Sequence, residues 1–199
     1  MRQPPPTSYP AILLTLDYAK DQPPLAGPST AAAAYQTAQL RLVSGTPNGN
    51  EGIAAGDAVF RDVVVLAQLS LAAGADDDLY GLYVRSPAPN LYYTFAVSSA
   101  GQVVISRYDG EYTQIGAGPL APDMKFERGL GEPNLFQVVA VGPSLTFVLN
   151  GMVVTSVMVD PRYKEGFVGF YVHHGVKSPR AELAADWIQV RAIFPEVLS

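Results

Sequence analysis

Apolar and polar residues alternate over many short segments of this chain, which is the two-residue period of a β-strand with one buried face. The alternation is clearest over residues 135–159, LFQVVAVGPSLTFVLNGMVVTSVMV, where three such segments are joined by two short turns. Asn150-Gly151 makes the second turn, because both residues tolerate the positive φ of a two-residue hairpin. Residues 142–144, GPS, make the first turn. The pattern therefore predicts a three-stranded antiparallel meander.

Further strands are expected along the whole chain, separated by segments rich in Gly, Pro, Asn and Asp. Asp109-Gly110 is a second strong hairpin signal. Residues 30–36 contain four alanines and favour one or two helical turns, whereas 44–56 and 116–133 are expected to be loops, the latter with at most one short strand. About eleven short strands result. Outside the meander they are expected at 9–17, 39–43, 62–71, 79–85, 91–98, 102–108, 111–115, 166–173 and 186–194.

A succession of short strands with almost no helix predicts an all-β fold, in which two antiparallel sheets pack face to face as a sandwich. No repeat of fixed period occurs in the sequence, which argues against a propeller or a solenoid. We expect a Pro-rich flexible start at residues 1–8 and a single β-sandwich domain over 9–199, because sandwiches of this length commonly form one unit.

Composition narrows the class of protein. With 48% hydrophobic and 16% charged residues, the chain has enough apolar material for a large core. A net charge of −5 and the lack of a basic stripe argue against a nucleic-acid partner. The absence of cysteine excludes disulfides, thiolate metal sites and a cysteine nucleophile. No run of 18 apolar residues occurs, so no membrane span is expected in this chain.

Localisation rests on the first ten residues, MRQPPPTSYP, which lack the apolar core of a signal peptide. A cytoplasmic protein is one interpretation of this start. We favour a chain that begins after a removed leader or anchor, and therefore an extracytoplasmic protein, secreted or held at the cell surface.

Five sequence segments resemble a known superfamily. They are GLYVR, YYTFAVSSAGQVVISRYDG, PNLFQVVAVGPSLTFVLNG, VDPRYKEGFVGFYV and ADWIQV, and the resemblance that they carry extends over about residues 35–194. In this order they resemble the concanavalin A-like lectin/glucanase superfamily, in particular the bacterial 3-keto-disaccharide hydrolase-like and LamG-like domains of unknown function. The resemblance implies a jelly roll with one convex and one concave sheet, with ligands on the concave side. It implies no single function, because members include glucanases, lectins and sugar-binding modules.

Catalytic motifs are missing from the sequence. The resemblance implies that a glucanase would carry its carboxylates on one strand as Glu-x-Asp-x-x-Glu, and this string does not occur. A Gly-x-Ser-x-Gly elbow is also absent. His173 and His174 are adjacent, so on a strand they point to opposite faces and do not chelate one metal. We predict no catalytic residue and favour a protein that is not an enzyme.

Three consecutive acids, Asp76-Asp77-Asp78, follow a turn-forming segment. Calcium binds oxygen ligands of this kind, and some members of the resembled superfamily hold calcium in loops. Yet the acids lack the alternate spacing of a dedicated ion loop, and a solvated turn explains them equally well. We predict no cofactor and no metal site, and keep Asp76 and Asp78 as weak calcium candidates.

A ligand-binding face is suggested by the residues that alternate with apolar ones in two strands. Tyr83 and Arg85 alternate with Leu82 and Val84, and Tyr171 and His173 do so with Phe170 and Val172. Aromatic rings next to hydrogen-bonding groups suit a sugar, since the ring stacks on C–H faces and the polar groups bind hydroxyls. The predicted ligand-binding residues are Tyr83, Arg85, Tyr92, Arg107, Tyr171 and His173.

A purely structural role is the alternative for these residues. Tyrosine is common on sheets because of its β propensity, and Arg85 would then only pair with a carboxylate such as Asp186. Trp187, the sole tryptophan, is expected in the core.

Three functions remain open from the sequence. The first is a non-catalytic, extracytoplasmic carbohydrate-binding module whose partner is a glycan on the sheet face. The second is a structural or accessory subunit of a cell-surface or membrane-associated assembly with a protein partner, favoured by a mean hydropathy of +0.13 and by apolar loop residues at 120–126. The third, a hydrolase of 3-keto-glycosides or other glycosides, is implied only by the family resemblance.

Overall fold

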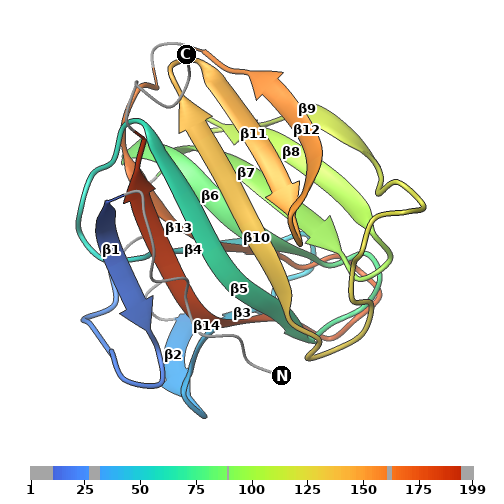
Figure 1. Ribbon diagram of the computed structural model, residues 1–199. Coiled ribbons are helices and arrows are strands. Elements are labelled where there is room, and N and C mark those ends of the chain that lie inside the picture. The colour runs from blue at the N-terminus through green and yellow to red at the C-terminus, as the bar shows by residue number, and fades with distance from the viewer. Residues whose placement is uncertain (1–10, 27–31, 89, 161–162, 194–199) are drawn as a thin grey trace.

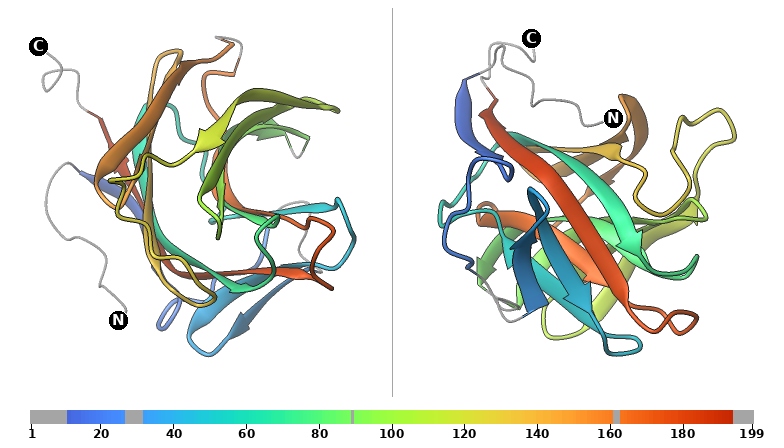
Figure 2. Two further views of the ribbon diagram at one scale, coloured as in Figure 1. Left: turned by 90° about the vertical axis from the view of Figure 1, so that its right-hand side faces the viewer. Right: turned by 90° about the horizontal axis from the view of Figure 1, so that it is seen from below.

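The computed structural model describes residues 11–26, 32–88, 90–160 and 163–193. Within them, the chain forms two antiparallel sheets packed face to face, as Figures 1 and 2 show. Sheet A has the order β12-β11-β10-β5-β14-β3-β2, with β1 paired to the other end of β14, and sheet B has the order β4-β13-β6-β7-β8-β9. The predicted all-β, two-sheet antiparallel sandwich is confirmed. The predicted flexible start, residues 1–8, lies outside the described residues.

The strands are distributed between the sheets as follows. Sheet A contains β1 (Ile12–Asp17), β2 (Ala33–Gln36), β3 (Gln39–Ser44), β5 (Val63–Ala73), β10 (Asn134–Val141), β11 (Ser144–Leu149), β12 (Met152–Met158) and β14 (Ala181–Ala192). Sheet B contains β4 (Asn50–Ala54), β6 (Leu79–Ala88), β7 (Leu91–Ser98), β8 (Gln102–Tyr108), β9 (Tyr112–Pro119) and β13 (Phe167–His173).

The hydrophobic core lies between the two sheets, because each strand sends alternate side chains into that space. Phe95 of sheet B is fully buried there, and its ring centroid is 5.2 Å from that of Phe147 in sheet A. Phe136 continues the stack, 6.0 Å from Phe147. Burial of these apolar surfaces is the main term that stabilises the sandwich. The side chains that alternate with core residues therefore face outward, and in sheet B they form the surface considered below.

The hairpin turns follow the sequence signals. Asn150 and Gly151 have φ of +48° and +83°, as a two-residue hairpin requires, and they join β11 to β12. Gly142 has φ of +50° in the turn between β10 and β11. Gly110 has φ of +99° in the connection between β8 and β9. The three-stranded meander and the second hairpin are thus confirmed.

Three predictions of local structure were wrong. Where helical turns were expected, the described residues Ala33–Gln36 form β2, because a tight turn with positive φ at Thr37 and Ala38 pairs them with β3. Strand pairing here outweighs the helix propensity of alanine. The expected loop at 44–56 contains strand β4, which pairs with β13 at the edge of sheet B. Strand β9 continues to Pro119, beyond its predicted end, because it pairs with all of β8.

The described residues form strands and connecting segments, and among them no helix has the length and apolarity needed to cross a membrane.

Candidate functional site

Five tyrosines lie together on the outer face of sheet B, turned away from the core. Their positions follow from strand alternation: Tyr83 is next to the core residue Leu82, and Tyr171 is next to the core residue Phe170. Cross-strand pairing brings Tyr92 opposite Tyr108. We call this group the tyrosine cluster; its members are Tyr83 on β6, Tyr92 on β7, Tyr108 on β8, Tyr112 on β9 and Tyr171 on β13.

The rings of the tyrosine cluster form one continuous layer. Tyr92 occupies the middle, with its ring centroid 5.5 Å from Tyr83, 5.2 Å from Tyr108 and 6.5 Å from Tyr112. Tyr108 and Tyr112 are 4.6 Å apart, and Tyr112 reaches to within 6.5 Å of Tyr171. Aromatic rings at these separations attract one another. The layer therefore links strand β9 to strand β13 across the face.

Two glycines make room for the innermost ring. A Cβ atom at Gly169 would lie 2.7 Å from Cε1 and Cζ of Tyr83, and a Cβ at Gly52 would lie 3.5 Å from Cε1 of the same ring. The Tyr83 ring therefore lies directly against the backbone of β13 at Gly169, where any other residue would push it away, whereas a Cβ at Gly52 would make only an ordinary contact with it.

Exposure differs strongly within the tyrosine cluster. Tyr83 and Tyr171 retain only 4% and 5% of their accessible surface, whereas Tyr112 retains 40%. Tyr92 and Tyr108 are half-buried. The surface open to a ligand is thus formed by Tyr112 and the accessible parts of Tyr92 and Tyr108, while Tyr83 and Tyr171 support them from below.

Hydrogen bonds fix the hydroxyl groups of this layer. The hydroxyls of Tyr92 and Tyr112 are 2.8 Å apart. The Tyr171 hydroxyl donates to Oδ1 of Asn50, and Nδ1 of His173 lies 3.0 Å from the same oxygen. Because an amide oxygen only accepts, Nδ1 of His173 is the donor, which leaves Nε2 of a neutral ring as an acceptor.

Burial also sets the protonation states. Desolvation raises the pKa of Tyr83, Tyr92, Tyr112 and Tyr171 above the usual value of tyrosine, so these hydroxyls stay protonated at neutral pH. Desolvation lowers the pKa of His173, although nearby Asp78 opposes the effect. The face therefore presents uncharged groups that both donate and accept hydrogen bonds.

Arg85, one of the predicted site residues, does not reach the tyrosine cluster. It has φ of +57° at a register shift in β6, and this bulge breaks the alternation on which its predicted facing relied. The buried guanidinium lies 3.2 Å from Asp62, 3.1 Å from the carbonyl oxygen of Gly142 and 3.2 Å from that of Tyr163. The expectation that Arg85 pairs with a structural carboxylate was right in kind, but the carboxylate is Asp62 rather than Asp186.

Arg107 also lies apart from the tyrosine cluster. It pairs across strands with Tyr93, whose ring belongs to the core, so it alternates with Tyr108 and faces the other side of the sheet. Its guanidinium lies 3.1 Å from a carboxylate oxygen of Asp109. Of the six predicted residues, the structure thus brings together Tyr83, Tyr92, Tyr171 and His173, and leaves out the two arginines.

The three consecutive acids hold two loops together. Asp78 is fully buried and accepts the backbone N–H of Gly175 at 2.6 Å, while Asp77 accepts that of Lys177 at 3.1 Å. Asp76 forms an ion pair of 2.8 Å with the Lys177 amine. A solvated turn is therefore wrong for Asp78, whose carboxylate is an acceptor inside the fold. Among the described residues, no group of three or more His, Cys, Asp or Glu is placed to hold a metal ion.

Trp187 is buried, with 1% of its surface exposed, but it is not part of the core between the sheets. A register shift between Ala185 and Trp187 places Ile188 in the core instead and turns the indole to the outer face of sheet A.

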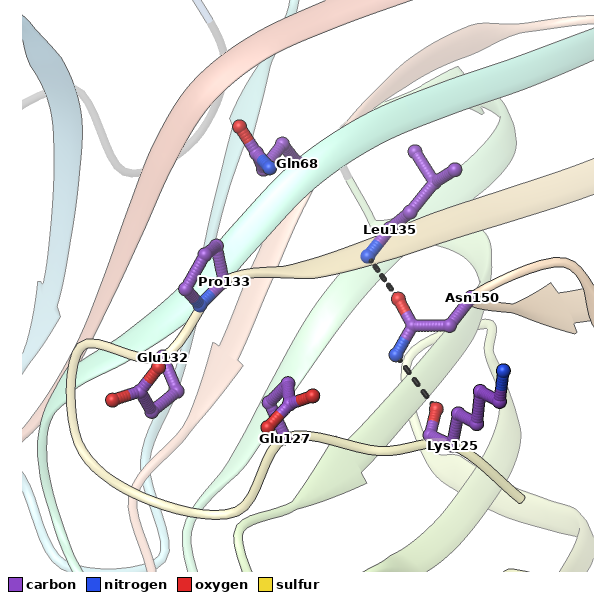
Figure 3. A pocket seen from close by; sticks show the side chains of 7 residues that line it. All are labelled: Gln68, Lys125, Glu127, Glu132, Pro133, Leu135 and Asn150. Carbon is purple, nitrogen blue, oxygen red and sulfur yellow. Dashed lines mark hydrogen bonds between the residues drawn. The ribbon is translucent and has the colours of Figure 1, made fainter. Parts of the chain in front are cut away.

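A pocket of about 480 Å³ lies on sheet A rather than on sheet B (Figure 3). Asn150 shapes it, since its Oδ1 accepts the N–H of Leu135 at 2.7 Å and its Nδ2 donates to the carbonyl of Lys125 at 2.7 Å. The amide of Asn150 thus holds the hairpin turn and the loop before β10 together. The lining residues are Gln68, Lys125, Glu127, Glu132, Pro133, Leu135 and Asn150.

Three residues of the candidate site escaped the sequence analysis. Tyr108 and Tyr112 flank the Asp109-Gly110 turn, and because three residues separate them, they pair directly and share a face. That signal was present in the sequence. Asn50 gave no comparable signal, since it belongs to β4, which was expected to be a loop.

Comparisons with known proteins give the fold alone. No protein-family model matches the chain, and no curated protein matches it. Among solved structures, the carbohydrate-binding module CBM66 from Bacillus subtilis superposes with a TM-score of 0.61 at 16% identity, over 77% of this chain and 87% of that one.

Two enzyme structures also superpose. A prokaryotic β-1,3-1,4-glucanase (lichenase) from a mouse hindgut metagenome gives a TM-score of 0.63 at 8% identity, over 90% and 99% of the two chains. The Crh5 transglycosylase gives 0.61 at 10% identity, over 92% and 85%. Nothing in these comparisons supports the specific link to 3-keto-disaccharide hydrolases. The chain has the concanavalin A-like lectin/glucanase fold, which carbohydrate-binding modules and glycoside-processing enzymes share.

Proposed function

We propose that this protein is a non-catalytic carbohydrate-binding module and that the tyrosine cluster is its binding face. The observation that carries the proposal is a layer of five tyrosine rings in contact, with one edge open to solvent and hydrogen-bonding groups beside it. Sugars have apolar C–H faces that stack on aromatic rings, and hydroxyls that need donors and acceptors at the ring margin.

Each part of the face has a role in this proposal. Tyr112, the most exposed ring, stacks on the sugar, and Tyr92 and Tyr108 extend the stacking surface. Asn50 and the neutral His173 bind hydroxyls at the margin next to Tyr171. Because the supporting rings are already packed and hydrogen-bonded, little side-chain freedom is lost on binding, which favours affinity.

A binding role is favoured over hydrolysis by the carboxylates near the face. Hydrolysis of a glycosidic bond ordinarily needs two carboxyl groups placed on either side of it. Of the described acids nearby, Glu51 pairs with the core residue Val172 and so faces the other side of sheet B, while Asp77 and Asp78 accept backbone N–H groups. Turnover of a 3-keto-glycoside by the purified protein would instead support the hydrolase alternative. We also propose that the protein is extracytoplasmic, because polysaccharide ligands are found outside the cytoplasm.

The test is a glycan array probed with the purified protein, followed by calorimetric titration of the glycans that bind. Tyr112→Ala removes the exposed ring, and Val153→Ala, which truncates a 64% exposed side chain on sheet A, is the matched control. We expect binding by the parent and the control, and an affinity at least about tenfold lower for Tyr112→Ala, because truncating an aromatic hot spot costs about 2 kcal/mol or more, and about 1.4 kcal/mol corresponds to tenfold.

Two results would refute the proposal. One is a folded parent that binds no glycan on the array, which would favour the accessory subunit with a protein partner. The other is an equal affinity of all three proteins for the same glycan, which would place the binding site elsewhere.

A further inference from the structure

The tyrosine cluster is surrounded by uncharged side chains. The two arginines that the strand pattern suggested for this face are engaged elsewhere: Arg85 by Asp62 and backbone carbonyls, and Arg107 by Asp109. Their guanidinium groups are therefore not available to a ligand on the tyrosine cluster.

The neighbouring side chains on this face are uncharged: register places Thr94 and Ser106 beside Tyr83. Glu51 pairs with the core residue Val172 and therefore faces the other side of sheet B. The chain as a whole carries a net charge of −5. An approaching anion thus meets uncharged hydroxyl, amide and imidazole groups, and neither of the two guanidinium groups lies among them.

Resting on the proposed function, we infer that the tyrosine cluster selects neutral glycans and rejects those that carry carboxylate or sulfate groups. A buried anion needs a cationic partner or several strong donors to offset its lost hydration. A neutral hydroxyl needs only one donor and one acceptor, which uncharged amide and imidazole groups such as those of Asn50 and His173 supply. These uncharged groups do not offset the hydration that a carboxylate loses when it binds.

The experiment compares one ligand in two charge states. A neutral glycan that binds on the array is titrated calorimetrically before and after oxidation of its primary alcohols to carboxylates, at low salt, where charge effects are least screened. We expect the oxidised glycan to bind at least tenfold more weakly, and the array to yield neutral glycans only.

A charge-gain variant separates repulsion from the loss of a hydroxyl. Gln114 is exposed and pairs with Ser106, on the same side of the sheet as Thr94 and Tyr83, so Gln114→Arg adds a cation to this face. Leu130→Arg adds the same charge to a loop outside it and is the control. Gln114→Arg should raise affinity for the oxidised glycan at least threefold, and Leu130→Arg should leave it unchanged.

The outcomes are distinguishable. Preferential binding of anionic glycans, equal affinity for the two forms, or no gain in Gln114→Arg overturns the inference while the proposed function stands. A parent that binds no glycan at all overturns both.

Discussion

Replacing Gly169 by alanine should disturb the tyrosine cluster from beneath. Gly169 is buried in β13, between β4 and β6, and the Tyr83 ring lies on it. An added Cβ would overlap the backbone carbonyl oxygen of Ile53 and would lie 2.7 Å from two atoms of the Tyr83 ring. The carbonyl belongs to a paired strand and has no freedom to rotate away, so the ring and the strand must both move.

The size of the effect follows from two opposing terms. Replacing glycine by alanine where there is room stabilises a protein by about 0.4–1 kcal/mol, through the unfolded state. Inserting a methyl group into a packed site costs about 1–3 kcal/mol, and a rigid backbone neighbour favours the upper part of that range. The net destabilisation expected for Gly169→Ala is about 2 kcal/mol, which for a chain of this size lowers Tm by about 4–8 °C.

Chemical and thermal unfolding measure this change. Gly118→Ala is the matched control, because a Cβ at Gly118 meets no atom within 4 Å. It should be neutral or slightly stabilising. Near-ultraviolet circular dichroism should change in Gly169→Ala alone, as the tyrosine rings are displaced. Equal stability and equal spectra for the two variants would refute the packing described for Tyr83.

Three further predictions concern groups around the face. Arg85→Met leaves the carbonyl oxygens of Gly142 and Tyr163 without the buried guanidinium that donates to them, and should lower the free energy of unfolding by about 2 kcal/mol in a denaturant titration. Glycan affinity should be unchanged, and a loss of affinity at equal stability would contradict the placement of Arg85. Asp78→Ala removes a buried hydrogen-bond acceptor and should lower the free energy of unfolding by about 2 kcal/mol, measured in the same way. An unchanged stability would contradict the role of Asp78 in holding the two loops together. Since burial lowers the pKa of His173 below the usual 6.5, the folded state disfavours its proton, so stability should fall as pH drops below 6.5 towards that lowered pKa. Glycan affinity should fall at lower pH, as pH passes through the lowered pKa and the folded ring gains its proton. A His173→Gln variant should lack both changes, and an unchanged pH profile in that variant would contradict this role.

The architecture was predictable because its signals are local. Alternation marks each long strand, and the turn at Asn150-Gly151 fixes a register without knowledge of the rest of the molecule. Strands β2 and β4 were missed for the opposite reason. Residues 33–36 favour helix by composition, and β4 exists because β13 offers it a partner distant in the sequence.

The candidate site was only partly predictable for a related reason. Tyr83 and Tyr171 follow from regular alternation, so their facing was derived correctly. Alternation fails at Arg85, where positive φ in a bulge turns the side chain towards Asp62. Which tyrosines touch depends on strand order in the sheet, and no local pattern gives that order. The Asp109-Gly110 hairpin pairs Tyr112 with Tyr108, but the contact of Tyr112 with Tyr171 on β13 follows only from the strand order.

The most direct test of the central claim is an NMR titration of the ring-labelled tyrosines with a glycan that binds on the array. We expect the ring signals of Tyr112, Tyr92 and Tyr108 to shift during the titration, while those of Tyr18 and Tyr35 stay in place; these two are in contact with each other, outside the tyrosine cluster. Shifts confined to Tyr18 and Tyr35, or a bound glycan that leaves the three cluster signals unchanged, would contradict the assignment of the tyrosine cluster as the binding face.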